Sequence, residues 1–587
     1  MDKTMSHIKT STKSALISQV SIIVVVSFGV YFNTLFNSFV YDDFFQIINN
    51  PWIRDPQNIL KIFSSGAWGF NATETNYYRP IMNIIYMVTY ALVKLKPWGY
   101  HLVNIVFHAA VSILVFFITS RIMRKAMHDL TGLRAFIPVM TALIFSLHPI
   151  HTEVVAWIGG IPDLTFSFFF LLSLYLYILA EKKERSLDPY FFTASIGSFF
   201  IATLCKEPAV TLPLIIVAYD LVFHRSRISI PFCFRRYSFY VLILCVYFIM
   251  RITALGGFAP VNQHADLTLL QALLNSVPLF VKYMYLLLVP VHLNAWHVFH
   301  PVLHIYDLAF ILALGLALSF FLFSLRAYRA NKLLFFSICL LTIPLLPALY
   351  IPGTGENPFA ERYLYLPTFG FAILLSLLLG KLSSAVSQGK MIVSVLFLMI
   401  CVLYSTITFS RNYDWKDDIT FWTDTSRKSP DEPLPHYNLG NALERQGRLD
   451  EAIQQYKRAI VLKPASVAYK ALGHVYSLKG LKNETAKEYM KALELEPGNA
   501  ELHNETGIIL METGNYDNAL DHFMKAVELV PDDAKLRYNY AIALRKNNRT
   551  PEAIDQLKIA IKLDPSQTSF RNALKRIAGE NKQQQDH

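Results

Sequence analysis

Residues 430–464 read PDEPLPHYNLGNALERQGRLDEAIQQYKRAIVLKP, and the prolines at both ends of this stretch recur along the C-terminal part of the chain. Prolines stand at positions 430, 464, 497, 531 and 565, so the spacing is 33 or 34 residues throughout. A fixed spacing of this length is typical of stacked helical repeats, in which each unit buries its apolar face against the next. We therefore expect the C-terminal part to be an α-solenoid.

Small and bulky residues occupy matching positions in each repeat. The first repeat has Gly440, where two helices must approach closely, and Tyr456, which fills the space between them. The matching pairs in the later repeats are Gly473 with Tyr489, Gly507 with Phe523, and Ala541 with Leu557. This pattern identifies the tetratricopeptide repeat, whose curved arrays bind extended peptides or other proteins. We expect about four repeats, a partial repeat at 416–430 and a capping helix at 567–578.

The rest of the chain has a membrane composition. Of 587 residues, 53% are hydrophobic and only 17% are charged, and the net charge is +11. From Arg411 onward there are 26 Lys/Arg and 26 Asp/Glu, so the excess positive charge lies before that residue. A neutral soluble domain has no electrostatic footprint for nucleic acid. The predicted domains are a membrane domain at 1–410, a connecting partial repeat at 411–432 and a repeat domain at 433–587.

The apolar segments predict about eleven membrane spans, because a span needs roughly 20 apolar residues and Lys/Arg concentrate in cytoplasmic loops. They lie near 15–35, 100–122, 134–148, 162–180, 190–205, 208–223, 238–254, 306–325, 333–350, 364–380 and 391–409. Residues 273–290 fit either a further span or a re-entrant segment, and the second choice keeps the basic residues cytoplasmic. Residues 77–95 suit an interfacial helix. The N-terminus is then cytoplasmic and the repeat domain extracytoplasmic.

Ionisable and polar side chains gather at the predicted outer ends of the spans. They are Asp42, Asp43, Tyr78, Arg79, His101, His148, His151, Glu153, Asp163, Lys206, Glu207, Glu361, Arg362 and Tyr363. Ionisable groups at membrane depth are costly and are usually functional or paired. Their concentration on one side predicts a cavity that faces outward.

Each of these groups also has a purely structural explanation. Asp42 and Asp43 could cap a helix, and Lys206 and Glu207 could form an internal ion pair. His148, His151 and Glu153 have the spacing of metal ligands, but a histidine-rich helix end explains them equally. Arg362 could be an interfacial anchor. No cysteine pair or zinc spacing is present, and no metal is expected.

Glycosyl transfer from a lipid phosphate fits an outward cavity that holds acidic residues and arginines. The leaving group is already a phosphate, so the reaction needs no general acid of the kind that two-carboxylate hydrolases use. One carboxylate suffices to deprotonate an acceptor hydroxyl. An arginine can bind the departing phosphate through two hydrogen bonds. The lipid tail of such a donor would explain why the enzyme is embedded in a membrane.

Several blocks resemble one family. FVYDDFFQIINNPWI (39–53), YYRPIMNIIY (77–86), HPIHTEVVAWIGGIPDL (148–164), CKEPAVTLPLIIVAYDL (205–221) and AERYLYLPTFGFAILL (360–375), followed by the repeats, are similar to the transmembrane and tetratricopeptide repeat-containing family. That family belongs to the GT-C glycosyltransferases. Its animal members are protein O-mannosyltransferases that use dolichyl-phosphate mannose in the endoplasmic reticulum. Two features depart from the pattern: the repeat array is short, and Ile161 stands where relatives often carry arginine.

The resemblance implies an inverting transferase that needs no metal or other cofactor. Asp42 or Asp43 would be the base, Arg362 and next Arg79 would bind the donor phosphate, and the repeats would present the acceptor protein. The expected partners are a polyprenyl- or dolichyl-phosphate sugar, an acceptor protein and membrane lipids, without nucleic acid. The membrane is either a bacterial inner membrane or the endoplasmic reticulum. The alternatives are a glycan or lipid acceptor, a membrane-anchored scaffold without chemistry, and a transporter, which would carry its ionisable residues near the bilayer midplane.

Overall fold

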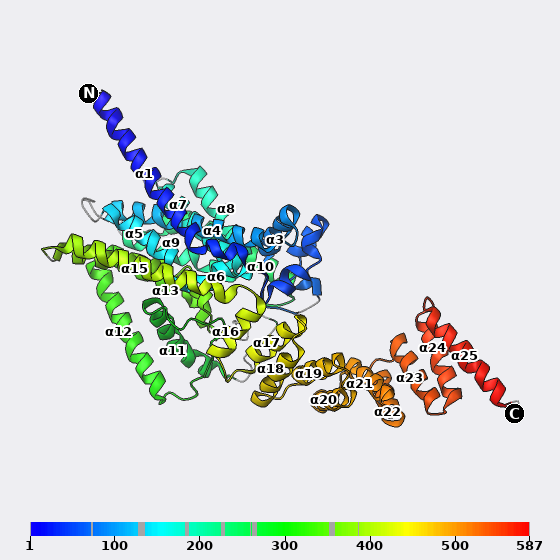
Figure 1. Cartoon of the computed structure of the whole chain (residues 1–587). Coiled ribbons are helices and arrows are strands. Elements are labelled where there is room, and N and C mark those ends of the chain that lie inside the picture. Colours follow the sequence, from blue (N-terminus) through cyan, green and yellow to red (C-terminus); the bar gives the residue numbers. More distant parts are fainter. Residues whose placement is uncertain are drawn as a thin grey trace. The chain divides into compact units, whose positions relative to one another are not determined.

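The computed structural model describes residues 2–71, 74–126, 135–181, 187–224, 229–258, 260, 267–351, 358–385 and 387–585. In these ranges the chain is helical, with one isolated β-bridge between Glu181 and Leu187 and no strand. It divides into two compact units, Met1–Phe421 and Trp422–His587 (Figure 1). The predicted all-α fold, with membrane helices followed by repeats, is confirmed.

The described part of the first unit contains fifteen α-helices before the helix that crosses into the second unit. They are α1 Asp2–Tyr31, α2 Ile59–Phe63, α3 Pro80–Val93, α4 Pro97–Ala126, α5 Ile137–Leu147, α6 Thr152–Ala156, α7 Ile161–Leu179, α8 Pro189–Cys205, α9 Leu212–Phe223, α10 Ile230–Leu255, α11 Leu269–Leu288, α12 Leu308–Ala330, α13 Lys332–Thr342, α14 Thr368–Ala385 and α15 Gly389–Arg411. Helix α16 spans Asp418–Lys428 and crosses the division between the two units.

The core of the first unit forms around α4, which packs against α1, α5 and α7. Helix α5 also packs against α14, which in turn packs against α13 and α15. The approach of α14 to α13 depends on Gly370, because a Cβ there would lie 2.4 Å from the backbone nitrogen of Leu341. Close approach of this kind is the usual role of small residues between membrane helices.

Nine segments of the described chain are long and apolar enough to cross a membrane. They are Ser14–Phe36, Pro97–Ala126, Ile158–Leu179, Ile230–Leu255, Leu269–Leu288, Leu308–Ala330, Lys332–Leu349, Thr368–Ala385 and Gly389–Trp415. A tenth exists if Ile137–Leu147 and Pro149–Ala156, which are bent by 47°, form one span. The chain is therefore a multi-pass membrane protein.

This count differs from the eleven spans predicted from sequence. Helices form in both predicted spans, 190–205 and 208–223, but α8 packs against α7 and α10 and α9 packs against α13, rather than the two pairing as a hairpin. Helix α8 has 17 residues and α9 only 12, whereas a span needs roughly 20. Helix α11, predicted to be re-entrant or interfacial, is long and apolar enough to span. Helix α3, predicted to be interfacial, has 14 residues and falls below span length. The side of the membrane on which each loop lies stays a prediction.

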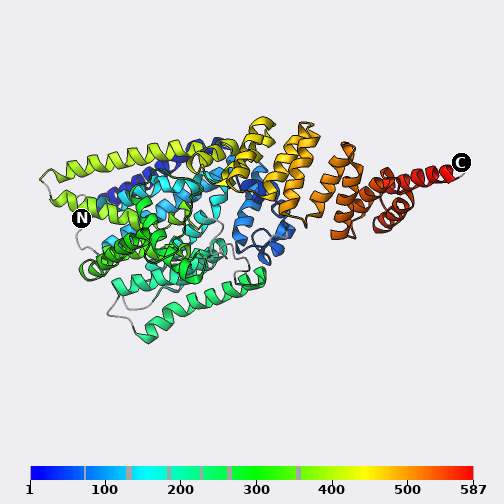
Figure 2. The same cartoon turned by 90° about the horizontal axis from the view of Figure 1, so that it is seen from below.

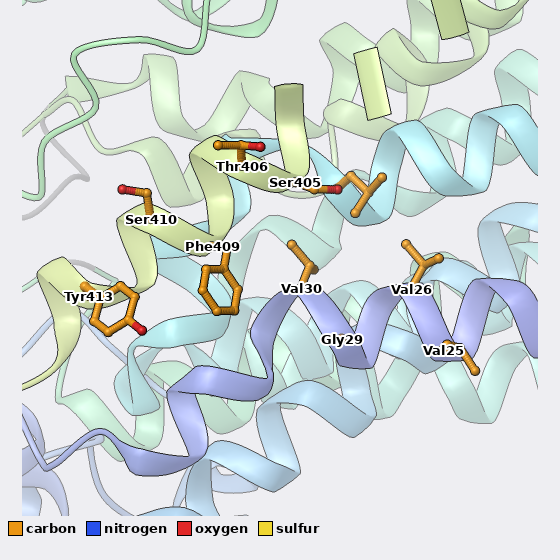
Figure 3. A pocket seen from close by; sticks show the side chains of 10 residues that line it. Val25, Val26, Gly29, Val30, Ser405, Thr406, Phe409, Ser410 and Tyr413 are labelled. Atoms are coloured by element: carbon orange, nitrogen blue, oxygen red, sulfur yellow. The ribbon is translucent and has the colours of Figure 1, made fainter. Parts of the chain in front are cut away.

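A groove with a volume of about 720 Å³ lies between the C-terminal parts of α1 and α15. The two helices converge toward their C-terminal ends in Figure 1, and Figure 2 shows the same helices from below. Val26 and Val30 of α1 line one side, and Ser405, Phe409 and Tyr413 line the other (Figure 3). Because both helices expose most of their apolar windows, we expect lipid chains to contact this groove.

The second unit has the regular helix pairs of a tetratricopeptide array. Its helices are α17 Pro433–Arg445, α18 Leu449–Leu462, α19 Ser466–Leu478, α20 Lys482–Leu495, α21 Ala500–Glu512, α22 Tyr516–Leu529, α23 Ala534–Lys546, α24 Thr550–Leu563 and α25 Thr568–Gln585. A Cβ at Gly440 would lie 2.5 Å from the Tyr456 ring, and one at Gly507 would lie 2.8 Å from the Phe523 ring. The glycine–aromatic pairing predicted from sequence is confirmed.

Candidate glycosyltransferase site

The aspartate pair lies in the segment that follows α1, and its two members have different environments. Asp43 is 0% exposed, and its two carboxylate oxygens accept hydrogen bonds from the backbone N–H groups of Val40 and Gly159, both at 3.0 Å. Burial raises the pKa of Asp43 well above its usual value, while these two hydrogen bonds act to lower it. Asp42 is half-buried. Asp43 therefore ties two segments together, and Asp42 is the more accessible carboxylate.

Tyr41, immediately before the pair, has a φ of +54°. A non-glycine residue in the left-handed region is uncommon, and such strain persists only where surrounding contacts hold it. The Tyr41 N–H donates to Asp418 Oδ1 at 3.0 Å, and the ring packs against Trp157 and Phe421. The conformation of the chain at Asp42 therefore depends on residues more than 370 positions away.

The segment 148–160 supplies the other hydrogen bond to Asp43. Asn104 of α4 donates its amide N–H to the Trp157 carbonyl oxygen at 2.7 Å and fixes the end of α6. A Cβ at Gly160 would lie 2.1 Å from the carbonyl oxygen of Val154, so the chain can turn here only with glycine. This turn directs the N–H of Gly159 toward Asp43.

Two ion pairs meet at the Tyr363 ring. The Arg362 guanidinium lies 2.6 Å from Glu153, and Lys206 Nζ lies 2.6 and 2.7 Å from the two oxygens of Asp163. Both cations lie over the Tyr363 ring, at 5.4 and 5.2 Å from its centroid. The Glu153 side chain is 2% exposed and that of Arg362 is 26% exposed, so a buried carboxylate holds an arginine that remains accessible.

Two arginines share the neighbouring carboxylate, Glu207. Arg79 Nη2 lies 2.8 Å from Glu207 Oε2, and Arg251 Nη1 lies 3.4 Å from Oε1. Burial acts to raise the pKa of Glu207, but the two arginines hold it below its usual value. The alternative in which Lys206 pairs with Glu207 is wrong, because their side chains take different partners.

Burial also affects Lys206, whose pKa falls to about 8. The Asp163 carboxylate opposes this shift, while the positive charges of Arg79 and Arg362 add to it. The ion pairs around Tyr363 and Glu207 contain one more basic residue than carboxylates. The basic residues are Arg79, Lys206, Arg251 and Arg362, and the carboxylates that pair with them are Glu153, Asp163 and Glu207. We name these seven side chains the basic cluster.

Glu361 lies next to Arg362 in the chain but belongs to a separate network. It is fully buried and accepts from the Asn294 N–H at 2.6 Å and from His297 Nε2 at 2.8 Å, and it pairs with Arg411 at 2.7 Å. Burial acts to raise the pKa of Glu361, but Arg411 and His297 hold it below its usual value. Glu361 thus connects the loop after α11 to the end of α15.

The remaining predicted site residues have packing contacts inside the protein. Tyr78 is buried and donates its hydroxyl to the Phe63 carbonyl. His148 binds the Leu287 carbonyl through Nε2, and His151 packs among aromatic rings that include Tyr365. His101 is buried on α4. Among the described residues, the group with three possible metal ligands is elsewhere, at Glu181, Asp220 and His224, where the Lys125 ammonium already lies 2.5 Å from Glu181 and 2.6 Å from His224.

Sequence reasoning missed an aromatic cluster of four side chains, Tyr41, Trp157, Trp415 and Phe421. Each ring contacts two others, at centroid distances from 4.6 Å for Trp415–Phe421 to 6.0 Å for Trp157–Trp415. The predicted connecting partial repeat at 411–432 contains Trp415 and Phe421, but a partial repeat does not require aromatic residues at these positions. These two aromatic residues are the signal by which the cluster could be found in the sequence.

These features define a class: a multi-pass membrane protein with a basic cluster and an aspartate pair, which are linked through the rings of Trp157 and Tyr41, followed by a tetratricopeptide array. The tetratricopeptide repeat family matches residues 425–565. The chain is 26% identical over 526 residues to Protein O-mannosyl-transferase TMTC3 of Homo sapiens, covering 82% of this chain and 55% of the relative. It is 28% identical over 468 residues to Protein O-mannosyl-transferase F38B6.6 of Caenorhabditis elegans, covering 78% and 64%.

These proteins are homologues of the chain, and the resemblance predicted from sequence is confirmed. The chain spans between about half and two thirds of the length of the curated relatives it matches. Among solved structures, "Crystal structure of YrrB: a TPR protein with an unusual peptide-binding site" aligns with 30% of the chain and 87% of its own, at 20% identity and a TM-score of 0.25.

Proposed function

We propose that the chain is a glycosyltransferase that moves mannose from a polyprenyl phosphate to Ser or Thr hydroxyls of exported proteins. The observation that carries this proposal is the excess of one positive charge in the basic cluster, close to an accessible carboxylate. Arg362 lies 6.0 Å from the Trp157 ring, and that ring packs against Tyr41, the residue before Asp42. The relatives, which are named protein O-mannosyl-transferases, support mannose and a protein acceptor.

Asp42 is the proposed base, because it is the more accessible member of the pair. It takes the proton of the acceptor hydroxyl as that oxygen forms a bond to the anomeric carbon of the sugar. The bond from that carbon to the phosphate oxygen breaks, and its electron pair leaves with the polyprenyl phosphate. A single displacement of this kind inverts the anomeric centre. Asp43 holds the loop and the 148–160 segment together.

The basic cluster is the proposed site for the donor phosphate. Arg362 has the most accessible side chain among the cluster's cations, and Glu153 holds it in place. Lys206 and Arg79 lie near enough to add their charge to a phosphate bound over Tyr363. Positive groups aimed at developing negative charge stabilise the transition state without reorganisation. Since side chains supply this charge, the proposed reaction uses no metal or other cofactor.

The repeats are proposed to present the acceptor protein, because tetratricopeptide arrays bind extended chains. The aspartate loop and the repeats are placed on the extracytoplasmic side, with the N-terminus in the cytoplasm. A glycan or lipid acceptor would use the same chemistry and would leave the repeats without this role.

The test is transfer of radiolabelled mannose from polyprenyl-phosphate mannose to membrane proteins by the full-length chain. Asp42→Asn should abolish transfer at matched expression. Asp55→Asn is the matched control, because Asp55 is an exposed carboxylate of the same segment and accepts a hydrogen bond from the N–H of Gln57. Loss of label in the Asp42 variant with retention in the control supports the proposal. Equal transfer by both variants and wild type would contradict it, and label in lipid or glycan alone would reassign the acceptor.

A further inference from the structure

The segment that follows the last membrane helix runs beside the segment that follows the first. Six hydrogen bonds join residues 30–41 to residues 409–418. Buried Asn412 donates to the Val30 carbonyl at 2.8 Å and to Asn33 Oδ1 at 2.7 Å, and its own carbonyl accepts from the Asn37 side chain at 3.1 Å. The other three bonds are Asn33 to the Phe409 carbonyl at 3.1 Å, the Ser38 N–H to the Lys416 carbonyl at 2.8 Å, and the Tyr41 N–H to Asp418 at 3.0 Å.

The last of these bonds lies at the strained position. Tyr41 has a left-handed backbone, and its N–H donates to the buried carboxylate of Asp418. Hydrogen bonds to charged acceptors are shorter and stronger than neutral ones. The Asp418 carboxylate thus stabilises the left-handed backbone conformation of Tyr41, the residue that precedes Asp42.

The same segment also supports the partner of Asp43. Trp415 and Phe421 pack on the rings of Trp157 and Tyr41, which stand two residues before Gly159 and Asp43 respectively. Residues 409–421 therefore contact both of the segments that the Asp43 carboxylate joins, the loop at Val40 and the loop at Gly159. Displacement of this segment would move Asp42 relative to the basic cluster.

Helix capping does not account for Asp418. Helix α16 begins at Asp418, and the preceding residue, Asp417, caps it by accepting from the Thr420 N–H at 2.8 Å. The two adjacent aspartates thus have different roles in the structure: one bonds its own helix, and the other bonds the aspartate loop.

We propose that Asp418 is a positioning residue for glycosyl transfer: it holds Tyr41 in the left-handed conformation that orients Asp42 toward the acceptor hydroxyl. This inference rests on the proposed function. Asp418 acts through Tyr41 and takes no proton from the substrate. Misplacement of a reacting group by about 1 Å can cost on the order of 100-fold in rate.

The test compares Asp418→Ala with Asp417→Ala in the full-length protein. Asp418→Ala should lower kcat for mannose transfer by about 10- to 100-fold and leave the KM for the polyprenyl-phosphate donor unchanged. Asp418→Asn, which keeps the acceptor oxygen, should restore most of the rate. Asp417→Ala removes one equivalent bond to a backbone N–H and should keep the wild-type kcat.

Hydrogen–deuterium exchange supplies a readout that does not depend on activity. Amides in peptides that cover residues 38–46 should exchange faster in Asp418→Ala and at the wild-type rate in Asp417→Ala. If Asp418→Ala does not accumulate, Asp418→Glu, which shifts the carboxylate by one methylene, should show the same two changes. Equal kcat losses in the two alanine variants, or faster exchange without a fall in kcat, would overturn the proposal. If wild type transfers no sugar, the proposed function fails, and the exchange result alone decides whether Asp418 holds the loop.

Discussion

Replacement of Asp43 by alanine should destabilise the protein because two buried backbone N–H groups would lose their acceptor. The carboxylate is fully buried and binds Val40 N and Gly159 N at 3.0 Å each. An unsatisfied buried donor costs about 1–3 kcal/mol, so the loss is about 2–6 kcal/mol in total. The true loss lies toward the lower end, because the variant also relieves the burial of a carboxylate whose pKa is raised.

Thermal unfolding of the detergent-purified protein, followed with a thiol-reactive dye, measures this effect. Cys205 and Cys339 are buried and should gain reactivity on unfolding, whereas Cys245 is already exposed and supplies a constant background. We expect Asp43→Ala to lower the Tm clearly, Asp43→Asn to lower it less because one acceptor oxygen remains, and Asp42→Asn to leave it near wild type. A wild-type Tm for Asp43→Ala, or an equal fall for Asp42→Asn, would refute the division of roles between the two aspartates.

The same carboxylate gives this measurement a pH dependence. The folded state binds the Asp43 proton more tightly than the unfolded chain, because burial raises its pKa in the fold. Stability from this group is therefore gained as the pH falls toward the ordinary carboxyl value of 3.8 and lost as the pH rises through the raised value. The Asp43→Asn variant should lack this component.

Three further predictions concern other parts of the chain. Gly507→Ala should destabilise the repeat unit by about 1–3 kcal/mol through overpacking, and faster limited proteolysis of that unit measures this effect. The control is Gly498→Ala, which should match wild type because a Cβ there would meet no atom within 4 Å. Transfer activity should fall as the pH rises through about 8, because Lys206 then loses its charge, and a flat profile there would exclude Lys206 from donor binding. Glu153→Gln should raise the KM for the donor more than it lowers kcat, because Arg362 loses the ion pair that fixes it, and an unchanged KM would count against Arg362 as the phosphate ligand.

The repeats could be predicted from sequence because their contacts are local. Gly440 and Tyr456, which touch, stand 16 positions apart, and a small and a bulky residue recur at this spacing in each repeat. The composition of the site was also predictable, since ionisable residues beside apolar runs are conspicuous. The partners that these residues take in the structure could not be predicted. Glu153 binds Arg362 across 209 positions and Tyr41 binds Asp418 across 377, and no spacing rule reaches so far.

The membrane helices show the complementary limit. Hydropathy predicted the break between the apolar runs 190–205 and 208–223, and α8 ends there at Cys205, but it did not predict which partners the charged residues in the break take. The backbone there turns so that Lys206 and Glu207 reach different partners. A run of apolar residues gives no information about these partners, because other segments of the chain supply them.

The hydrogen bonds between residues 30–41 and 409–418 also determine how the protein can be dissected. Hydropathy places the end of the membrane domain near residue 410, and a fragment cut there would retain every candidate catalytic and phosphate-binding residue. It would lack Asn412, Trp415, Asp418 and Phe421, and with them the support of Tyr41. A fragment that ends after Phe421 keeps that support. Fragments of the two lengths share the same proposed chemistry, and only the longer one should hold Asp42 in place.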